Sequence, residues 1–329
     1  MNDTPPAAAI ASTGPSARAD ADPDALPLGQ RIRRRAAAFW LNYFFWHTRY
    51  IPWVARWTKW FYLSLAWRYS RVLPRVTLAN ARHILGPQAT DAQRTRLAKH
   101  TIGSFYDFVY DVGRSRGMSV PRILRQVEAI EGHPTYERVR ALHRGAIVVT
   151  AHMGSFEVGV AALRQHESRV HVVFQRDTMD RFEQLRGELR RRLGVIEAPL
   201  EQGWDMWLRL REALKADEVV LLQGDRVLPG QRGQRVPFFD GHIMLPTGPM
   251  KLALATGAPL LPVFTIRRRH GKIRLFIEEP IFVEQNCPRG QTHPALLQLA
   301  GVLERYVRAY PHQWLILRPA WCEDAPSDS

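Results

Sequence analysis

The fold is decided by residues 146–157, whose sequence is AIVVTAHMGSFE. The first five residues form a short run rich in β-branched side chains, which favours a buried strand. A glycine–serine pair then interrupts the run, and the residues that follow have helical character. The sequence therefore predicts that His152 lies at the carboxyl end of a strand and Glu157 in the first turn of a helix, where open α/β sheets place their sites.

His152 and Glu157 together form a His-x4-Glu pattern. On one continuous helix, two residues at this spacing would point about 140° away from each other. A bend at Gly154 removes that obstacle, so the carboxylate can approach the imidazole, fix its tautomer and stabilise its protonated form. A general base that acts on a hydroxyl group needs this support. The alternative is a structural histidine in the core beside a carboxylate at a helix start.

Further short segments follow this pattern in a fixed order. They are Val172 to Arg176, Leu221 to Arg226, Val236 to Phe239, Pro246 to Gly248, Thr256 to Val263 and Tyr310 to Trp314. With residues 149–157, they resemble the lysophospholipid acyltransferase superfamily, and most closely its branch of late lauroyl and myristoyl acyltransferases of lipid A biosynthesis. The resemblance runs from about residue 95 to residue 321.

The sequence departs from that branch in two places. Residues 317–319 read Leu-Arg-Pro where the branch usually has His-Arg-Arg, and residues 224–226 read Gly-Asp-Arg where it usually has two acidic residues. The resemblance therefore implies an acyltransferase but leaves the acceptor open.

Acyl transfer to a hydroxyl needs a base, a group that stabilises the oxyanion, and an apolar slot for the chain. We expect His152 to be the base and Glu157 the residue that orients it, with Ser155 as a helix cap. Arg176 and Arg226 follow strands and are expected to hold phosphate or neutralise developing charge; the alternative is that each forms a surface ion pair. Asp225 either binds the acceptor or pairs with Arg226.

Two further features suggest anion binding. Gly248 precedes a helix that begins at Pro249, and a helix N-terminus can bind an anion. The predicted helix over 181–193 carries Arg186, Arg190, Arg191 and Arg192, which we expect at the periphery of the molecule. The chain shows no helix-turn-helix, RNA-recognition motif or zinc pattern, so we expect no nucleic-acid partner.

The composition of the chain indicates which kinds of partner and cofactor to expect. The chain has 329 residues, and 46 Lys and Arg against 31 Asp and Glu give a net charge of +15. This excess favours an anionic partner such as acidic lipid headgroups or an acidic acyl donor. Cys287 and Cys322 lack metal-ligand spacing and are interpreted as reduced thiols. No nucleotide-binding motif or Cys/His cluster is present, so we expect no cofactor and no metal site.

The N-terminal part divides in two. Residues 1–30 are rich in Ala, Pro and Asp and are predicted to be a disordered tail. Residues 31–67 combine arginines with many Trp, Tyr and Phe residues, but their longest run without charge or histidine is too short to span a bilayer of about 30 Å. This composition suits the headgroup boundary of a membrane. The alternative is a pair of helices whose aromatic side chains pack on the core.

The remaining chain alternates between predicted helices and strands. Helices are predicted over 90–113, 132–143, 181–193, 204–216, 249–256 and 294–310, and strands over 146–150, 170–174, 218–223, 260–266 and 272–277. This order favours an α/β fold with a mixed sheet flanked by helices. We predict a tail over 1–30, membrane-interfacial aromatic helices over 31–89, and an acyltransferase domain over 90–329.

The sequence thus predicts a membrane-associated O-acyltransferase. It would move a fatty acyl group from an acyl carrier protein or acyl-CoA thioester to a lipid or glycolipid hydroxyl. We expect it at the cytoplasmic face of the inner membrane, attached by a peripheral or re-entrant N-terminal anchor. The alternatives are acylation of a specialised lipid, such as an aryl-polyene or ornithine-type lipid, and a non-catalytic basic protein that docks on membranes.

Overall fold

The computed structural model describes residues 42–115, 117–176, 180–228, 231–284, 287 and 291–324. The tail predicted over 1–30, and residues 31–41 of the aromatic segment, lie outside the described residues. Contacts divide the chain into two units, Met1–Tyr43 and Phe44–Ser329, and the second unit contains all the strands and the helices α2 to α12. The predicted boundaries at residues 30 and 89 stay predictions.

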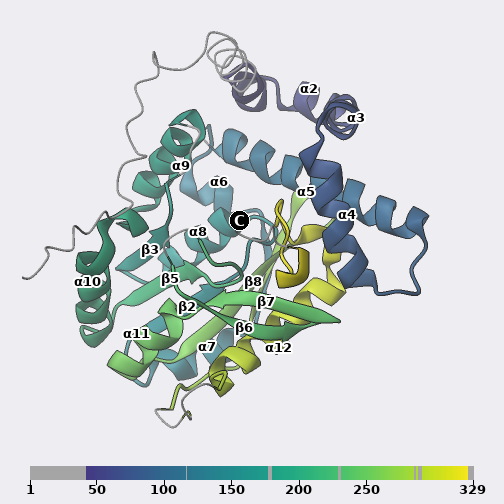
Figure 1. Ribbon diagram of the computed structural model, residues 1–329. Coiled ribbons are helices and arrows are strands. Elements are labelled where there is room, and N and C mark those ends of the chain that lie inside the picture. The colour runs from purple at the N-terminus through teal and green to yellow at the C-terminus, as the bar shows by residue number, and fades with distance from the viewer. Residues whose placement is uncertain are drawn as a thin grey trace, which may run out of the picture. The chain divides into compact units, whose positions relative to one another are not determined.

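The second unit is built on a mixed sheet (Figure 1). Its strands and those of a separate hairpin are β1 (Val127–Glu131), β2 (Ala146–Thr150), β3 (Val170–Phe174), β4 (Ile196–Pro199), β5 (Val219–Gln223), β6 (Gly233–Phe238), β7 (Gly241–Pro246), β8 (Leu260–Arg267) and β9 (Ile273–Ile277). The seven-stranded sheet has the order β1-β9-β8-β2-β5-β3-β4, and β6 pairs with β7. Within this sheet, neighbouring strands are parallel except β8 and β9, which are antiparallel, and the separate β6–β7 hairpin is also antiparallel. The predicted α/β class with a mixed sheet is therefore confirmed.

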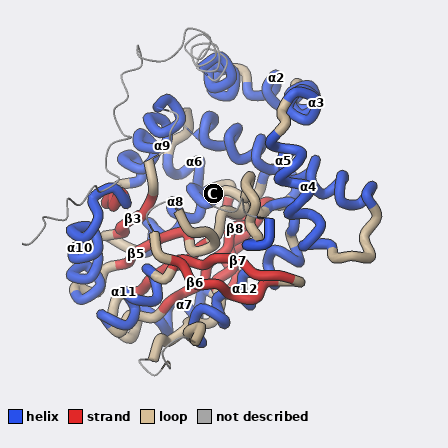
Figure 2. The backbone as a smooth tube through the Cα atoms, in the orientation of Figure 1, coloured by secondary structure: helices blue, strands red, loops and turns tan. Residues whose placement is uncertain are grey.

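Helices cover both faces of this sheet (Figure 2). They are α2 (Pro52–Trp57), α3 (Lys59–Tyr69), α4 (Val72–Leu85), α5 (Asp91–Ser115), α6 (Val120–Leu124), α7 (His133–Arg140), α8 (Phe156–His166), α9 (Asp180–Leu193), α10 (Gly203–Lys215), α11 (Gly248–Thr256) and α12 (Pro294–Ala309). Residues 42–50 are also helical. Each helix and strand expected from the sequence is present, with ends shifted by a few residues at most. The strands β1 and β4, the helix α6 and the β6–β7 hairpin are not predicted from the sequence.

The alternation of side chains along the central strands separates two cores. Val149, Leu222 and Leu260 face one side and pack with α10, α11 and α12. Val148 and Leu221 face the other side and pack with α6, α7, α8 and α9. The carboxyl ends of β2, β3 and β5 consequently lie together between two helical layers.

The aromatic helices α2 and α3 are fixed to α5 by polar contacts. The Lys59 ammonium pairs with Asp107 at 2.7 Å, and the Tyr106 hydroxyl donates to the Ala55 carbonyl at 2.6 Å. Across the part of the chain that the structure describes, helices of membrane-spanning length and apolarity are absent.

Candidate active site

His152 is placed by a sharp turn between β2 and α8. Gly154 adopts φ +56°, and a Cβ atom at this position would lie 2.2 Å from the Thr265 carbonyl oxygen. Only glycine fits there, because the conformation is left-handed and β8 leaves no room for a side chain. Ser155 occupies the N-cap position of α8, but its side chain makes no capping hydrogen bond, so the expected cap is not formed.

The partner of His152 comes from β5 rather than from α8. Thr150 and Gln223 are in register where the parallel strands β2 and β5 end. His152 and Asp225 each lie two residues beyond that pair and therefore meet. The Nδ1 atom of His152 is 2.7 Å from Asp225 Oδ1, and the His152 backbone N–H donates to Oδ2 at 2.9 Å.

A third contact comes from the C-terminal part of the chain. The Trp314 indole N–H donates to Asp225 Oδ2 at 2.9 Å. Trp314 also forms a β-bridge with Met153, and the Leu315 N–H donates to the His152 carbonyl at 2.7 Å. Both carboxylate oxygens of Asp225 are thus hydrogen-bonded, and the turn that carries His152 is fixed from two sides.

This arrangement determines the protonation of the pair. Burial alone would raise the pKa of Asp225, but the adjacent His152 and its hydrogen bonds hold that pKa at about 2. Burial lowers the pKa of His152 below its usual value, although Asp225 acts in the opposite direction. At neutral pH the carboxylate is therefore charged and the imidazole neutral. Nδ1–H donates to Asp225, which leaves the lone pair of Nε2 as the base.

Glu157 does not make the predicted contact with His152. Both of its carboxylate oxygens are buried without a hydrogen-bond partner among the described residues. Its nearest charged neighbour is Arg186, whose Nε lies 3.6 Å from Oε1. Burial raises the pKa of Glu157, and the charge of Arg186 opposes that effect. The residue that orients His152 is therefore Asp225, whereas a catalytic role for Glu157 stays a prediction.

The arginines of α9 are not all peripheral, which corrects the expectation from the sequence. The Arg186 side chain is only 15% exposed and stacks over the rings of Phe156 and Phe182. Arg190 is buried over the Phe174 ring and pairs with Glu183 and Glu197. Of the four arginines expected at the periphery, Arg191 and Arg192 are exposed. The apolar stripe of α9 packs on α8, so the residues next to that stripe are enclosed.

The other predicted site residues are distributed around the strand ends. Arg226 follows Asp225, and its charge lowers the pKa of both Asp225 and His152. Arg176 follows β3; its side chain is exposed, and its backbone N–H donates to Glu201 at 3.0 Å. Gly248 is the first residue of α11, and a Cβ atom there would lie 2.7 Å from the Trp207 indole. Their roles in substrate binding stay predictions.

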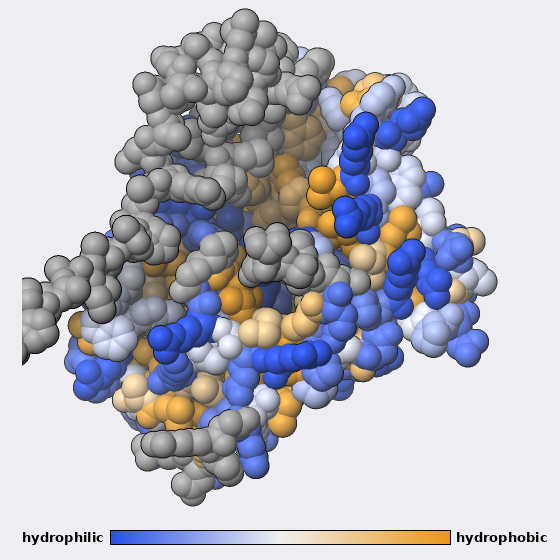
Figure 3. All heavy atoms as spheres, viewed as in Figure 1, coloured by the Kyte–Doolittle hydropathy of each residue, from blue (hydrophilic) through white to orange (hydrophobic). Residues whose placement is uncertain are grey.

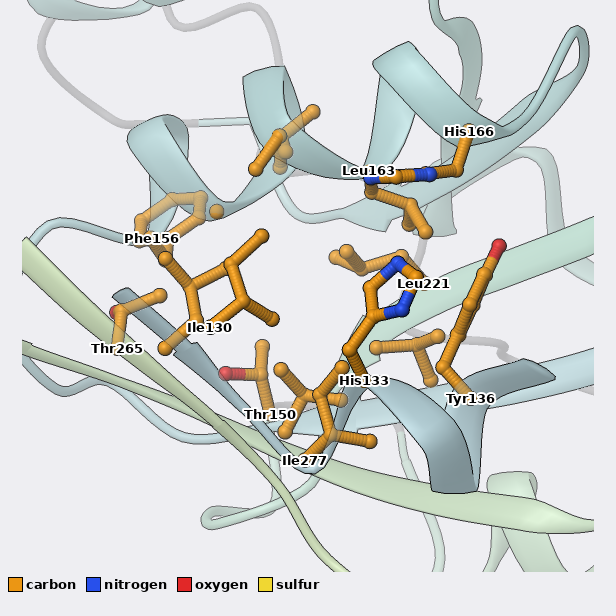
Figure 4. Close-up of a pocket in the computed structure, with 16 residues that line it drawn as sticks. Ile130, His133, Tyr136, Thr150, Phe156, Leu163, His166, Leu221, Thr265 and Ile277 are labelled. Carbon is orange, nitrogen blue, oxygen red and sulfur yellow. The ribbon is translucent and has the colours of Figure 1, made fainter. Parts of the chain in front are cut away.

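An apolar cavity lies between α8 and the sheet (Figure 4). It has a volume of about 50 Å³. Phe156 and Thr265 lie at one end and the rings of His133, Tyr136 and His166 at the other (Figure 4). Because the Thr265 hydroxyl donates to the Met153 carbonyl at 2.8 Å, the first end lies beside the turn that follows His152.

The described residues contain no group of three or more His, Cys, Asp and Glu side chains that could hold a metal ion. The site that they do form is a buried His–Asp pair at the carboxyl edge of an α/β sheet, with an apolar cavity next to it. These features define an enzyme site suited to proton transfer.

Sequence comparison identifies the family. Residues 30–323 match the model of the bacterial lipid A biosynthesis acyltransferases. The chain belongs to this family and is an acyltransferase that acts on lipids. It is 25% identical over 289 residues to a phosphatidylinositol mannoside acyltransferase of Mycobacterium tuberculosis strain CDC 1551 / Oshkosh, covering 81% of this chain and 89% of the relative. A protein of the same name from Mycolicibacterium smegmatis is 25% identical over 253 residues, with 76% and 80% covered.

Two features of the site escaped the sequence analysis. The sequence leaves the acceptor or Arg226 as the partner of the Asp225 carboxylate, and it gives Trp314 no role. One signal was available: Asp225 follows its strand at the same offset as His152 follows β2. That offset brings the two residues together only if β2 and β5 are parallel neighbours in register.

Proposed function

We propose that this enzyme transfers an acyl group from a thioester to a lipid hydroxyl by general-base catalysis. His152 Nε2 takes the proton of the acceptor hydroxyl while its oxygen attacks the thioester carbonyl carbon. The tetrahedral intermediate then collapses, the carbon–sulfur bond breaks, and the imidazolium returns the proton to the departing thiolate. The observation that carries this proposal is the array of His152, Asp225 and Trp314, which fixes the tautomer and the ring orientation.

The apolar cavity along α8 is the proposed slot for the acyl chain. Its walls are mainly Ile, Val, Leu and Phe side chains, and it begins beside the His152 turn. At about 50 Å³ it holds only a short segment of a chain, so a longer chain must separate α8 from α7. The rings of His133, Tyr136 and His166 would then limit its depth (Figure 4).

We also propose the two substrates of this reaction. The donor is a thioester of acyl carrier protein or coenzyme A, and the acceptor is a glycolipid hydroxyl. The relatives named phosphatidylinositol mannoside acyltransferases support a glycolipid acceptor in particular.

We further propose that α2 and α3 attach the enzyme to the cytoplasmic face of the inner membrane as a peripheral anchor. Trp53, Trp57 and Trp60 are 69%, 71% and 64% exposed. Basic side chains lie among them, and hydrophilic and hydrophobic residues alternate over α3 and α4 in Figure 3. Aromatic rings of this kind partition into the headgroup region, where anionic lipids attract cations.

The decisive test of the chemistry is His152→Ala in the purified full-length enzyme. We expect kcat to fall by roughly 10²–10⁴-fold or more, because the general base is lost. His171→Ala is the matched control, since His171 is also buried and paired with a carboxylate, Glu218, at 2.5 Å, but belongs to the interior of β3. Near-normal turnover by a folded His152→Ala enzyme would rule out this mechanism.

The anchor is tested by sedimentation with anionic vesicles. Replacing Trp53, Trp57 and Trp60 together by alanine should weaken vesicle binding at least tenfold. Salt should weaken the wild type only in part, because aromatic burial is not screened. The control replaces Leu142, Phe282 and Leu297, which are also exposed but lie elsewhere. Unchanged binding of the tryptophan variant would refute the anchor.

A further inference from the structure

A large groove lies between α10 and α11, on the sheet face opposite to the apolar cavity. Its volume is about 960 Å³, at the upper end of the roughly 300–1,000 Å³ found for small-molecule sites. Trp204, Trp207 and Leu208 of α10 form one wall, and the first turns of α11 form the other. The groove reaches Leu222 and Gln223 at the end of β5.

The apolar wall of this groove continues to the surface. The Trp204 side chain is 73% exposed and Leu208 is 38% exposed at the rim. Trp207 lies against the start of α11, where Gly248 leaves room for the indole. Exposed tryptophan and leucine at the mouth of a groove suit an apolar chain that enters from a membrane surface.

The charged side chains that line the groove are all cationic. Arg211, Arg232 and Lys251 line it, and no described Asp or Glu does so. The ion pair of Arg211 with Glu212 spans 3.7 Å between exposed side chains and contributes little. The N-terminus of α11 also opens into the groove and adds partial positive charge. This lining is complementary to a phosphate group.

The position of the groove connects it to the reaction. Leu222 lines the groove, whereas Leu221, the preceding residue of β5, lines the apolar cavity on the other face. His152 and Asp225 lie just beyond the carboxyl ends of β2 and β5, so the two spaces approach the reacting pair from opposite faces of the sheet.

We propose that the groove between α10 and α11 binds the acceptor as a phosphate-bearing lipid. Its apolar chain lies against Trp204 and Trp207, and its phosphate lies among Arg211, Arg232 and Lys251. The assignment to the acceptor rests on the proposed function, in which the acyl chain of the donor occupies the cavity along α8. The exposed rim favours a lipid over the phosphopantetheine arm of a donor, because that arm carries no long apolar chain outside its acyl group.

The test measures binding without turnover. Full-length enzyme in neutral detergent is titrated with dioleoyl phosphatidylglycerol and, separately, with coenzyme A, and bound ligand is counted by native mass spectrometry. The variant is Arg232→Ala with Lys251→Ala. The control is Arg122→Ala with Arg125→Ala, which removes the same charge from an exposed site on and after α6.

We expect the groove variant to bind phosphatidylglycerol at least tenfold more weakly, with coenzyme A affinity changed less than twofold and the control like the wild type. Trp204→Ala should weaken lipid binding without affecting coenzyme A. The proposal is overturned if lipid binding is unchanged, if the control loses as much, or if coenzyme A binding is lost instead. His152→Ala should bind lipid normally, so failure of the proposed chemistry would remain distinguishable from failure of the groove.

Discussion

Asp225 and Glu157 are both buried carboxylates near the strand ends, but their surroundings differ. Asp225 has both oxygens hydrogen-bonded, by His152 and Trp314, and its pKa is held at about 2. Neither Glu157 oxygen has a hydrogen-bond partner among the described residues, and burial raises its pKa. Asp225 should therefore contribute to both stability and catalysis. Glu157 should lower the stability of the folded enzyme, so we expect its role to be functional.

The surroundings of Asp225 are therefore preorganised, whereas those of Glu157 lack hydrogen-bond donors. A buried charge without hydrogen bonds costs folding free energy unless a partner compensates. Arg186 compensates Glu157 in part, at 3.6 Å. We therefore expect the Glu157 oxygens to accept hydrogen bonds only when substrate is bound.

Replacing Asp225 by asparagine should have the largest effect. The charge that supports the imidazolium is lost, and kcat should fall by roughly 10²–10⁴-fold. The lowered pKa of Asp225 stabilises the folded state above pH 3.8, and this contribution is lost as the pH falls toward about 2, so the variant should also unfold at lower temperature at neutral pH. Asp240→Asn is the control, because Asp240 forms a 2.7 Å pair with His83 outside the site. Equal losses in both variants would contradict a special role for Asp225.

Glu157→Gln should stabilise the folded enzyme, whereas Asp225→Asn should destabilise it. Because the pKa of Glu157 is raised, its buried charge lowers stability at neutral pH, and the variant should unfold at a higher temperature. The advantage should disappear below about pH 4.5, where the wild-type carboxyl binds a proton in both states. Turnover should fall roughly tenfold if the carboxylate contacts substrate. Glu218→Gln, which removes an acid already paired with His171, should instead destabilise the enzyme. A Glu157→Gln variant that is less stable than the wild type but fully active would show that Glu157 supports the fold and not the function.

Trp314→Phe should have a smaller effect. It removes one hydrogen bond to Asp225 Oδ2, worth about 1 kcal/mol, so kcat should fall roughly fivefold. Trp321→Phe removes a comparable buried indole bond, to the Phe238 carbonyl at 3.1 Å, and should leave kcat nearly unchanged. Thermal melting of both variants separates loss of fold from loss of function. If the two variants lose equal activity, Trp314 only supports packing.

The smallest expected effect is on the pH profile. Burial lowers the pKa of His152, so the neutral base should persist below pH 6.5, and kcat/KM should decline only under more acidic conditions. Asp225→Asn removes the charge that opposes this shift, so the residual activity should decline at a still lower pH. The profile is measured with the acyl donor held at saturation. A decline that begins above pH 6.5 would contradict a base with a lowered pKa.

The sequence predicted the framework well because the central strands carry an unambiguous signal. Residues 146–150 and 219–223 are short β-branched or leucine-rich runs bounded by breakers, and both form parallel strands. The hairpin was missed because Pro237 interrupts the pattern of β6, although proline is tolerated in a strand of this two-stranded ribbon. Short β1 and β4 lie at the edges of the sheet, where the apolar signal is weak.

The partner of His152 was predicted incorrectly for a different reason. Glu157 is close in sequence, so local spacing favoured it. Asp225 lies 73 positions away and becomes a neighbour only through the register of β2 with β5. The spacing of two residues in the sequence can indicate a local turn, but it does not show which strands are neighbours in the sheet. The same limit applies to Trp314, which is 89 positions from Asp225.

The contact of Trp314 and Leu315 with the His152 turn also has a consequence for synthesis of the chain. A ribosome adds His152 to the chain first, then Asp225, and Trp314 last, so the hydrogen bond from Trp314 to Asp225 becomes possible only when synthesis has passed residue 314. Every partial product that ends before residue 314 contains the base and its carboxylate but lacks the segment that fixes their turn. We expect such incomplete chains to be poor catalysts.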